Sequence, residues 1–247
     1  MDRMIYIAMT GAAHMAERQA TIAHNLANAS TTGYRADISA FRAAYVNGAG
    51  LTTRAFVVDS TAGADLTPGP IQETGRNLDV AVAGDGWIAV QMEDGSEAYT
   101  RDGSLQVDAS GLLQTHDGRN VLGDGGPITL PQDTQAVIGR DGTVSAVPNG
   151  NQPNTVSTVG RIKLVNPEPA QLTKGSDGLF HLAGGEPAEA DAGVSLVTGA
   201  LEGSNVNVVS AMVDMIESAR QYEMNMSLLQ NADQNERAAA QTLLINS

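Results

Sequence analysis

The chain has 247 residues and a formal net charge of −14, and it contains 27 glycines, no cysteine and only 4% aromatic residues. The acidic charge repels phosphate backbones and anionic lipid surfaces, so we expect no nucleic-acid binding. The lack of cysteine excludes disulfides, thiolate zinc sites and cysteine nucleophiles, and no apolar run approaches the ~18 residues that span a bilayer, so we expect no membrane insertion.

The first predicted element is a long helix that ends near residue 28. Its apolar or small residues recur at alternating steps of three and four, which is the spacing of one stripe of a coiled coil. We call this stripe the N-terminal seam; its residues are Ile5, Ala8, Ala12, Met15, Gln19, Ile22 and Leu26. Gly33 can adopt the left-handed conformation that closes a helix end. Thr10 and Gly11 dilute the apolar run near the N-terminus, so we expect no cleaved signal peptide.

Residues 34–76 show no clear period and are predicted to form an extended connector with a few short strands. From residue 77 the pattern changes, because Leu78, Val80 and Val82 recur at every second position, as in a strand with one buried face. Asp-Gly pairs then separate short apolar runs, and both residues tolerate the positive φ of tight turns. Residues 77–203 therefore predict a hairpin-rich, mainly antiparallel β domain with an exposed loop over residues 148–158. The expected strands include residues 87–92, 98–100, 105–107, 112–115, 136–138, 161–165 and 179–182.

A second long helix is predicted from about residue 208 to residue 245, after the N-cap candidates Ser204, Asn205 and Asn207. It carries a C-terminal seam with the same spacing, which Asp233 and Glu236 interrupt near its end. The seam residues are Val208, Met212, Met215, Ala219, Tyr222, Met226 and Leu229. Because chain ends fray unless they have partners, we expect both seams to form a subunit interface.

These elements predict an α+β fold in which long N- and C-terminal helices pair as a coiled coil and the β domain is inserted between them. The expected domains are a terminal helical domain of residues 1–33 with 204–247, the connector of residues 34–76, and the β-rich outer domain of residues 77–203.

The sequence predicts no active site. Residues 84–89 match a relaxed dinucleotide-binding fingerprint, but they precede a predicted strand instead of opening a helix. The Asp-rich turns lack the acidic spacing of an EF-hand. The histidines, which also lack metal-type spacing, are His14, His24, His116 and His181. We therefore expect no catalytic residue, no cofactor and no metal.

Two blocks of the sequence resemble the bacterial flagellar axial proteins, the rod and hook family. The first block is Asn25-Leu26-Ala27-Asn28 followed by Thr31-Thr32-Gly33-Tyr34-Arg35. The second block includes Asn77-Leu78-Asp79-Val80, Gly84-Asp85-Gly86-Trp87 and Tyr99-Thr100-Arg101-Asp102-Gly103. The family motif in the first block comprises Asn25, Leu26, Asn28, Thr32, Gly33 and Tyr34. Within the family, residues 2–12 and 204–224 are most similar to a proximal rod protein, with a distal rod protein as the alternative.

The resemblance implies a structural subunit of the flagellar basal-body rod, exported unfolded by the flagellar type III apparatus without leader cleavage. It implies helical assembly with other rod proteins and with copies of itself into a hollow, torque-transmitting shaft that crosses the periplasm. In such proteins the terminal helices form an inner tube and the β domain lies outside it. The residues alone leave two alternatives open: a secreted β-rich binding module or enzyme with a helical oligomerisation stalk, and a free-standing homo-oligomeric coiled coil.

Overall fold

The structure is a computed structural model that describes residues 2–45, 55–148 and 156–245. The chain divides into two compact units. Unit 1 comprises Met1–Ala27, Asp37–Gly63 and Asn207–Ser247, and unit 2 comprises Asn28–Ala36 and Ala64–Val206. Most of the loop predicted at residues 148–158 lies outside the described residues. Within the described ranges, no helix is both long enough and apolar enough to cross a bilayer.

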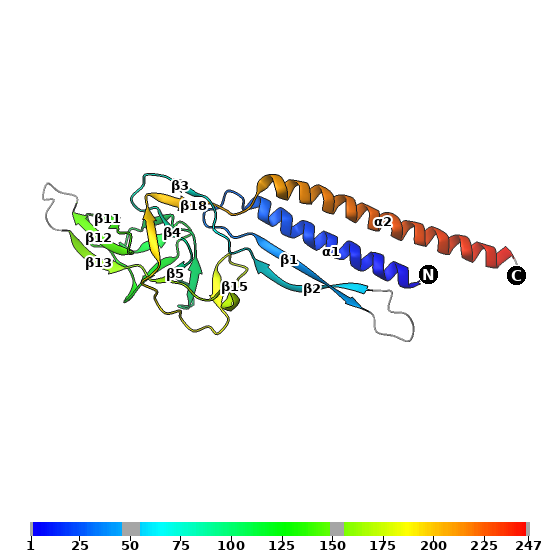
Figure 1. Ribbon diagram of the computed structural model, residues 1–247, viewed down its shortest axis with the longest axis horizontal. Helices are drawn as coiled ribbons and strands as arrows, with labels where there is room; N and C mark the ends of the chain where they lie inside the picture. Colours follow the sequence, from blue (N-terminus) through cyan, green and yellow to red (C-terminus); the bar gives the residue numbers. More distant parts are fainter. Residues whose placement is uncertain (1, 46–54, 149–155, 246–247) are drawn as a thin grey trace. The chain divides into compact units, whose positions relative to one another are not determined.

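Unit 1 is built from two helices and a two-stranded sheet. The helices are α1 (Asp2–Ala27) and α2 (Val208–Ile245), and the strands are β1 (Asp37–Tyr45) and β2 (Ala55–Ala64). Figure 1 shows α1 and α2 side by side and antiparallel, with both chain ends at the same end of the pair. Asn207 caps α2, because its side-chain oxygen accepts a hydrogen bond from the Ser210 amide at 3.1 Å.

The α+β class is confirmed, but the predicted pairing of the two helices as a coiled coil is wrong. A coiled coil needs apolar side chains at the inward positions of both helices. Ser218 is the one buried side chain among the described residues of α2, and Asn225 lies against Gly11 of α1. By contrast, Val208 and Met212 of the predicted C-terminal seam are exposed. The less exposed face of α2 therefore mixes polar residues such as Ser218 and Asn225 with apolar ones, and is not a continuous apolar seam.

Unit 2 consists of antiparallel sheets, in agreement with the prediction from the Asp-Gly turns. Its largest sheet has nine strands with the path β15-β16-β6-β5-β9-β8-β7, while β10 pairs with β9 and β14 pairs with β5. The strands of this sheet are β5 (Trp87–Gln91), β6 (Glu97–Thr100), β7 (Leu105–Val107), β8 (Leu113–Thr115), β9 (Asn120–Gly123), β10 (Gly126–Pro127), β14 (Leu164–Val165), β15 (Leu172–Lys174) and β16 (Phe180–Leu182).

Three smaller sheets complete unit 2. A three-stranded sheet has the order β11-β12-β13, β17 pairs with β4, and β18 pairs with β3. The bounds are β3 (Ile71–Glu73), β4 (Val80–Ala83), β11 (Thr134–Ile138), β12 (Thr143–Pro148), β13 (Ser157–Arg161), β17 (Ser195–Thr198) and β18 (Ala200–Glu202). One 3₁₀ turn, η1 (Pro169–Gln171), precedes β15.

Aspartate side chains organise the tight turns of unit 2. In the turn between β7 and β8, the Asp108 carboxylate accepts hydrogen bonds from the amides of Ser110 and Leu112 at 2.9 and 2.8 Å. The Ser110 hydroxyl also donates to this carboxylate and contributes most to holding the pKa of Asp108 below its usual value. Such side-chain hydrogen bonds within a turn take the place of the backbone hydrogen bonds between strands, which the chain cannot form where it reverses direction.

Aliphatic side chains from several sheets fill the interior of unit 2. The largest buried cluster includes Val80, Ile88, Leu105 and Leu113, each fully enclosed. A second cluster surrounds Trp87, whose ring lies 4.4 Å from that of Phe180, centroid to centroid. Unit 2 thus has a closed apolar core of its own, as a stable domain requires.

Candidate assembly surface and buried polar cluster

The outward side of α2 carries a row of exposed apolar residues, which we call the α2 outer stripe. The most exposed are Val209 at 72%, Met224 at 61% and Ile216 at 56%. The full stripe is Val209, Met212, Val213, Ile216, Met224 and Leu228. Ser218, the buried residue, follows Val209 by about 2.5 helical turns, so the two point in opposite directions. α2 therefore leaves large apolar side chains in solvent on the side opposite Ser218, although Met215, Met226 and Leu229 are half-buried.

The two predicted seams differ in how far their residues are exposed. In α1 the seam follows the least exposed side of the helix: Ala12 and Ile22 are buried, and Ile5, Ala8, Met15 and Leu26 are half-buried. In α2 the seam is divided: Met215, Ala219, Met226 and Leu229 are half-buried, whereas Val208, Met212 and Tyr222 are exposed. Sequence periodicity missed most of the outer stripe because α2 carries apolar residues on more than one face.

The first residues of the family motif lie at the end of α1, where Asn25 forms hydrogen bonds to the following segment. The Asn25 amide donates to the Asp37 carbonyl at 2.9 Å and accepts from the Asp37 amide at 2.8 Å. The His24 imidazole also lies 2.7 Å from the Asp37 carboxylate. Asn25 thus joins the end of α1 to the start of β1, and Leu26 is half-buried beside it in sequence.

The remaining motif residues belong to unit 2. The Asn28 carbonyl accepts a hydrogen bond from the Thr31 amide at 3.1 Å, and Thr32 is half-buried. Gly33 has φ of +67°, and a Cβ there would lie 2.4 Å from the backbone carbon of Arg101, so only glycine fits. Tyr34 is buried, with the Lys174 ammonium 4.0 Å from its ring centroid. The motif therefore positions backbone and supplies no reactive group.

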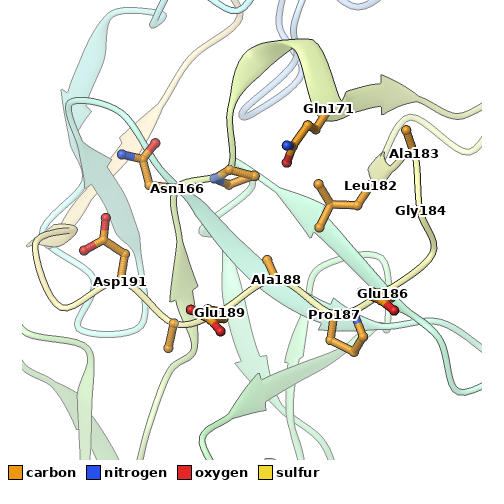
Figure 2. A pocket seen from close by; sticks show the side chains of 12 residues that line it. Asn166, Gln171, Leu182, Ala183, Gly184, Glu186, Pro187, Ala188, Glu189 and Asp191 are labelled. Carbon is orange, nitrogen blue, oxygen red and sulfur yellow. The ribbon is translucent and has the colours of Figure 1, made fainter.

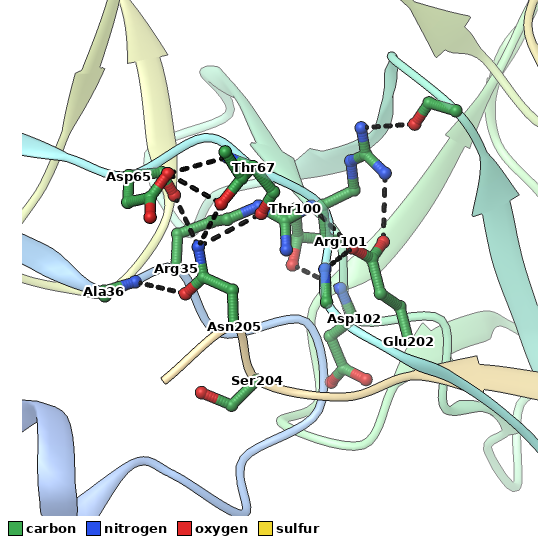
Figure 3. A network of polar contacts seen from close by, with 12 residues as sticks. Arg35, Ala36, Asp65, Thr67, Thr100, Arg101, Asp102, Glu202, Ser204 and Asn205 are labelled. Atoms are coloured by element: carbon green, nitrogen blue, oxygen red, sulfur yellow. Dashed lines mark hydrogen bonds and ion pairs between the residues drawn. The ribbon is translucent and has the colours of Figure 1, made fainter. Parts of the chain in front are cut away.

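Arg35, Glu202 and Arg101 form a buried ionic cluster in unit 2 (Figure 3). One carboxylate oxygen of Glu202 accepts from Arg35 at 2.6 Å and from the Gly69 amide at 2.8 Å, and the other accepts from Arg101 at 2.9 Å. Both guanidinium carbons lie within 6 Å of the Trp87 ring centroid, a cation–π distance. Burial lowers the pKa of Arg101; Arg35 lowers it further, and Glu202 opposes both effects.

Asn205 connects three segments of unit 2, and Figure 3 shows these contacts. Its side-chain oxygen accepts from the Ala36 amide at 2.8 Å, and its side-chain nitrogen donates to the carbonyls of Asp65 and Thr67 at 2.9 and 3.0 Å. Ala36, Asp65 and Asn205 lie within two residues of points where the chain passes from unit 2 to unit 1. Of the three N-cap candidates Ser204, Asn205 and Asn207, it is Asn207 that caps α2.

A groove of about 820 Å³ lies in unit 2 beside η1 and the segment after β16 (Figure 2). Ala188 lies at the groove, and its amide donates to the Tyr99 hydroxyl at 2.8 Å; burial raises the pKa of Tyr99 to about 12. The charged residues that line the groove are acidic: Glu186, Glu189 and Asp191. Among the described residues no group of three or more potential ligands could hold a metal ion.

Comparisons with known proteins identify relatives of the chain. Residues 5–35 match the model of flagella basal body rod proteins, residues 81–146 match the flagellar hook protein FlgE/F/G D1 domain, and residues 197–242 match the flagellar basal body rod FlgEFG protein C-terminal region. The chain is 48% identical to the flagellar basal-body rod proteins FlgF of Salmonella typhimurium and of Escherichia coli, over 98% of this chain and 99% of each relative. It is 34% identical to FlgG of Agrobacterium fabrum over 94% of this chain and 96% of that protein.

Proposed function

Since the chain belongs to the family of flagellar basal-body rod proteins, which are structural subunits of the basal body, we propose that the α2 outer stripe is its packing surface in the rod. The observation that carries this proposal is the exposure of six large apolar side chains on α2. Exposed apolar patches on a protein surface mark interaction sites. The stripe falls within residues 197–242, the region that matches the C-terminal family model.

Burial of the stripe supplies a driving force for subunit addition. A fully buried Val, Ile, Leu or Met side chain contributes roughly 1.5–3 kcal/mol relative to its exposed state. The six residues of the stripe are each at least half exposed. Part of the gain offsets the entropy lost when two molecules associate, so the stripe has to be buried over most of its length to hold a subunit.

We also propose that the terminal helices and the β-rich part have different roles in the rod. The terminal helices form an inner tube, and the β-rich part packs outside it, in contact with other rod proteins and with copies of this chain. Contacts between unlike surfaces propagate as a helix when they do not close into a ring, so one subunit type can extend a tube. The 48% identity to two proteins named FlgF, against 34% to a protein named FlgG, supports a position in the proximal part of the rod. We propose export by the flagellar type III apparatus without leader cleavage, and a location where the rod crosses the periplasm.

The proposal is tested by placing a charge on the stripe. Ile216→Asp is expected to abolish incorporation into isolated basal bodies and to abolish motility, because an unpaired carboxylate in an apolar contact is strongly disfavoured. The matched control is Ile216→Val, which keeps an apolar side chain at the same position and is expected to leave incorporation intact. Normal incorporation of the Ile216→Asp variant would show that the stripe is not the packing surface.

A further inference from the structure

The segment Asn28–Ala36, which we call the strap, belongs to unit 2 although β1 and β2 separate it in sequence from the rest of that unit. Polar contacts attach the strap at several points, and its Tyr34 side chain is buried. The Gly33 amide donates to the Glu202 carbonyl, the Ala36 amide to the Asn205 side chain, and the Lys174 ammonium to the Arg35 carbonyl, each at 2.8 Å. The apolar clusters identified among the described residues of unit 2 lie entirely within Ala64–Val206 and include no strap residue.

The strap brings surplus positive charge into the interior. Arg35 and Arg101 share one carboxylate, that of Glu202, and the three side chains are between 0% and 3% exposed. Within the described residues, Nε and Nη1 of Arg35 and Nε of Arg101 have no hydrogen-bond acceptor. Asp85 adds an attraction to Arg101, but it is exposed to solvent. A buried charge without its own counter-ion is costly even when a neighbouring ring face takes up part of its field.

The remainder of the cluster is balanced without the strap. If Arg35 leaves, Glu202 keeps Arg101 and the Gly69 amide, which together form a neutral and hydrogen-bonded pair. Arg101 also keeps the Gly84 carbonyl as an acceptor at 2.8 Å. Undocking therefore exposes a complete ion pair and removes the excess charge, whereas docking restores that charge to the interior.

We propose that the strap is a releasable segment, that unit 2 stays folded when the strap undocks, and that Arg35 keeps the docked state marginal. Both elements that flank the strap, α1 and β1, belong to unit 1, so its release reduces the number of places at which the chain passes between the two units. The proposal concerns the isolated chain and does not depend on the proposed packing surface.

Amide hydrogen exchange of the full chain, followed by NMR, tests the proposal. In the wild type, the amides of Gly33 and Ala36 are expected to exchange faster than that of Ala89, which donates to Lys163 in the main sheet. Arg35→Met removes the excess charge and is expected to slow strap exchange about tenfold, whereas Glu202→Gln leaves two buried cations and is expected to accelerate it on the order of a hundredfold. Exchange at Ala89 should not change in Arg35→Met.

A third variant tests whether unit 2 survives without the strap. In Gly33→Ala the new Cβ would overlap the Arg101 backbone, so the strap is expected to be open while Ala89 stays protected. The proposal is overturned if Arg35→Met speeds strap exchange or leaves it unchanged, since Arg35 would then not limit docking. It is also overturned if wild-type strap and Ala89 amides exchange at one common rate, or if Gly33→Ala exposes Ala89.

Discussion

The two units differ in where they place their large apolar side chains. In unit 2 the large aliphatic side chains are enclosed, and the polar groups of the turns bond within the same turn. In unit 1, α2 encloses a serine and leaves a valine, an isoleucine and several other apolar side chains in solvent. Unit 2 is thus complete within one chain, whereas α2 is suited to a partner that covers its outer stripe. A rod subunit needs both properties, because it must persist as a folded body and also join others.

The largest expected difference between the units is in the effect of shortening an apolar side chain. Leu113→Ala in the core of unit 2 is expected to lower the free energy of unfolding by about 3 kcal/mol or more, because it leaves a cavity. Ile216→Ala on the outer stripe is expected to change the monomer by no more than about 0.5 kcal/mol. Denaturant titration can follow unit 2 through Trp87, the single tryptophan, and the helices through far-ultraviolet circular dichroism. A comparable loss of unfolding free energy in both variants would mean that the stripe is already buried in the monomer.

A smaller difference in stability is expected between the alanine variants of two asparagines near the start of α2. Asn205→Ala removes side-chain bonds to Ala36, Asp65 and Thr67, and we expect a loss of about 2 kcal/mol in unit 2, seen in the Trp87 signal. Asn207→Ala removes the α2 cap, and we expect a loss of about 1 kcal/mol seen in helical content alone. If Asn207→Ala shifted the Trp87 transition as far as Asn205→Ala, Asn205 would have no special role in joining the segments.

The smallest expected effect concerns pH and the turn aspartates. The pKa of Asp108 lies below its ordinary value of 3.8, so this group stabilises unit 2 above about pH 4, and the contribution is lost as pH falls through the folded pKa. Ser110→Ala removes the hydroxyl that lowers the pKa most and is expected to raise it, as NMR titration of the carboxyl carbon can measure. Ser96→Ala, which affects the Asp94 turn, is the control. An unchanged Asp108 pKa in Ser110→Ala would contradict this assignment.

Local patterns predicted much of unit 2 and the existence of the two helices. Asp-Gly turns on either side of short apolar runs locate strands such as β5 and β7, because each turn depends on a few neighbouring residues. The ionic cluster had no such signal, since Glu202 lies 167 positions from Arg35 and 101 from Arg101. A sequence pattern does not report which distant charges meet inside a fold.

The error in the helices has a physical cause. In α1 the large apolar residues Met15, Ile22 and Leu26 lie on one side, so periodicity selects the side that includes buried Ala12 and Ile22. In α2 the apolar residues are spread around the helix, and a spacing of three and four can be traced along more than one face. The less exposed face of α2 also includes small and polar residues such as Ser218 and Asn225, which an apolar pattern cannot detect.

The central claim is that the α2 outer stripe is free in the monomer and covered in the rod. The chain contains no cysteine, so Ile216→Cys introduces a single thiol that a maleimide can label. We expect rapid labelling of the purified monomer, strong protection in isolated basal bodies, and full labelling after those basal bodies are dissociated. Equal labelling rates in the monomer and in intact basal bodies would contradict the claim.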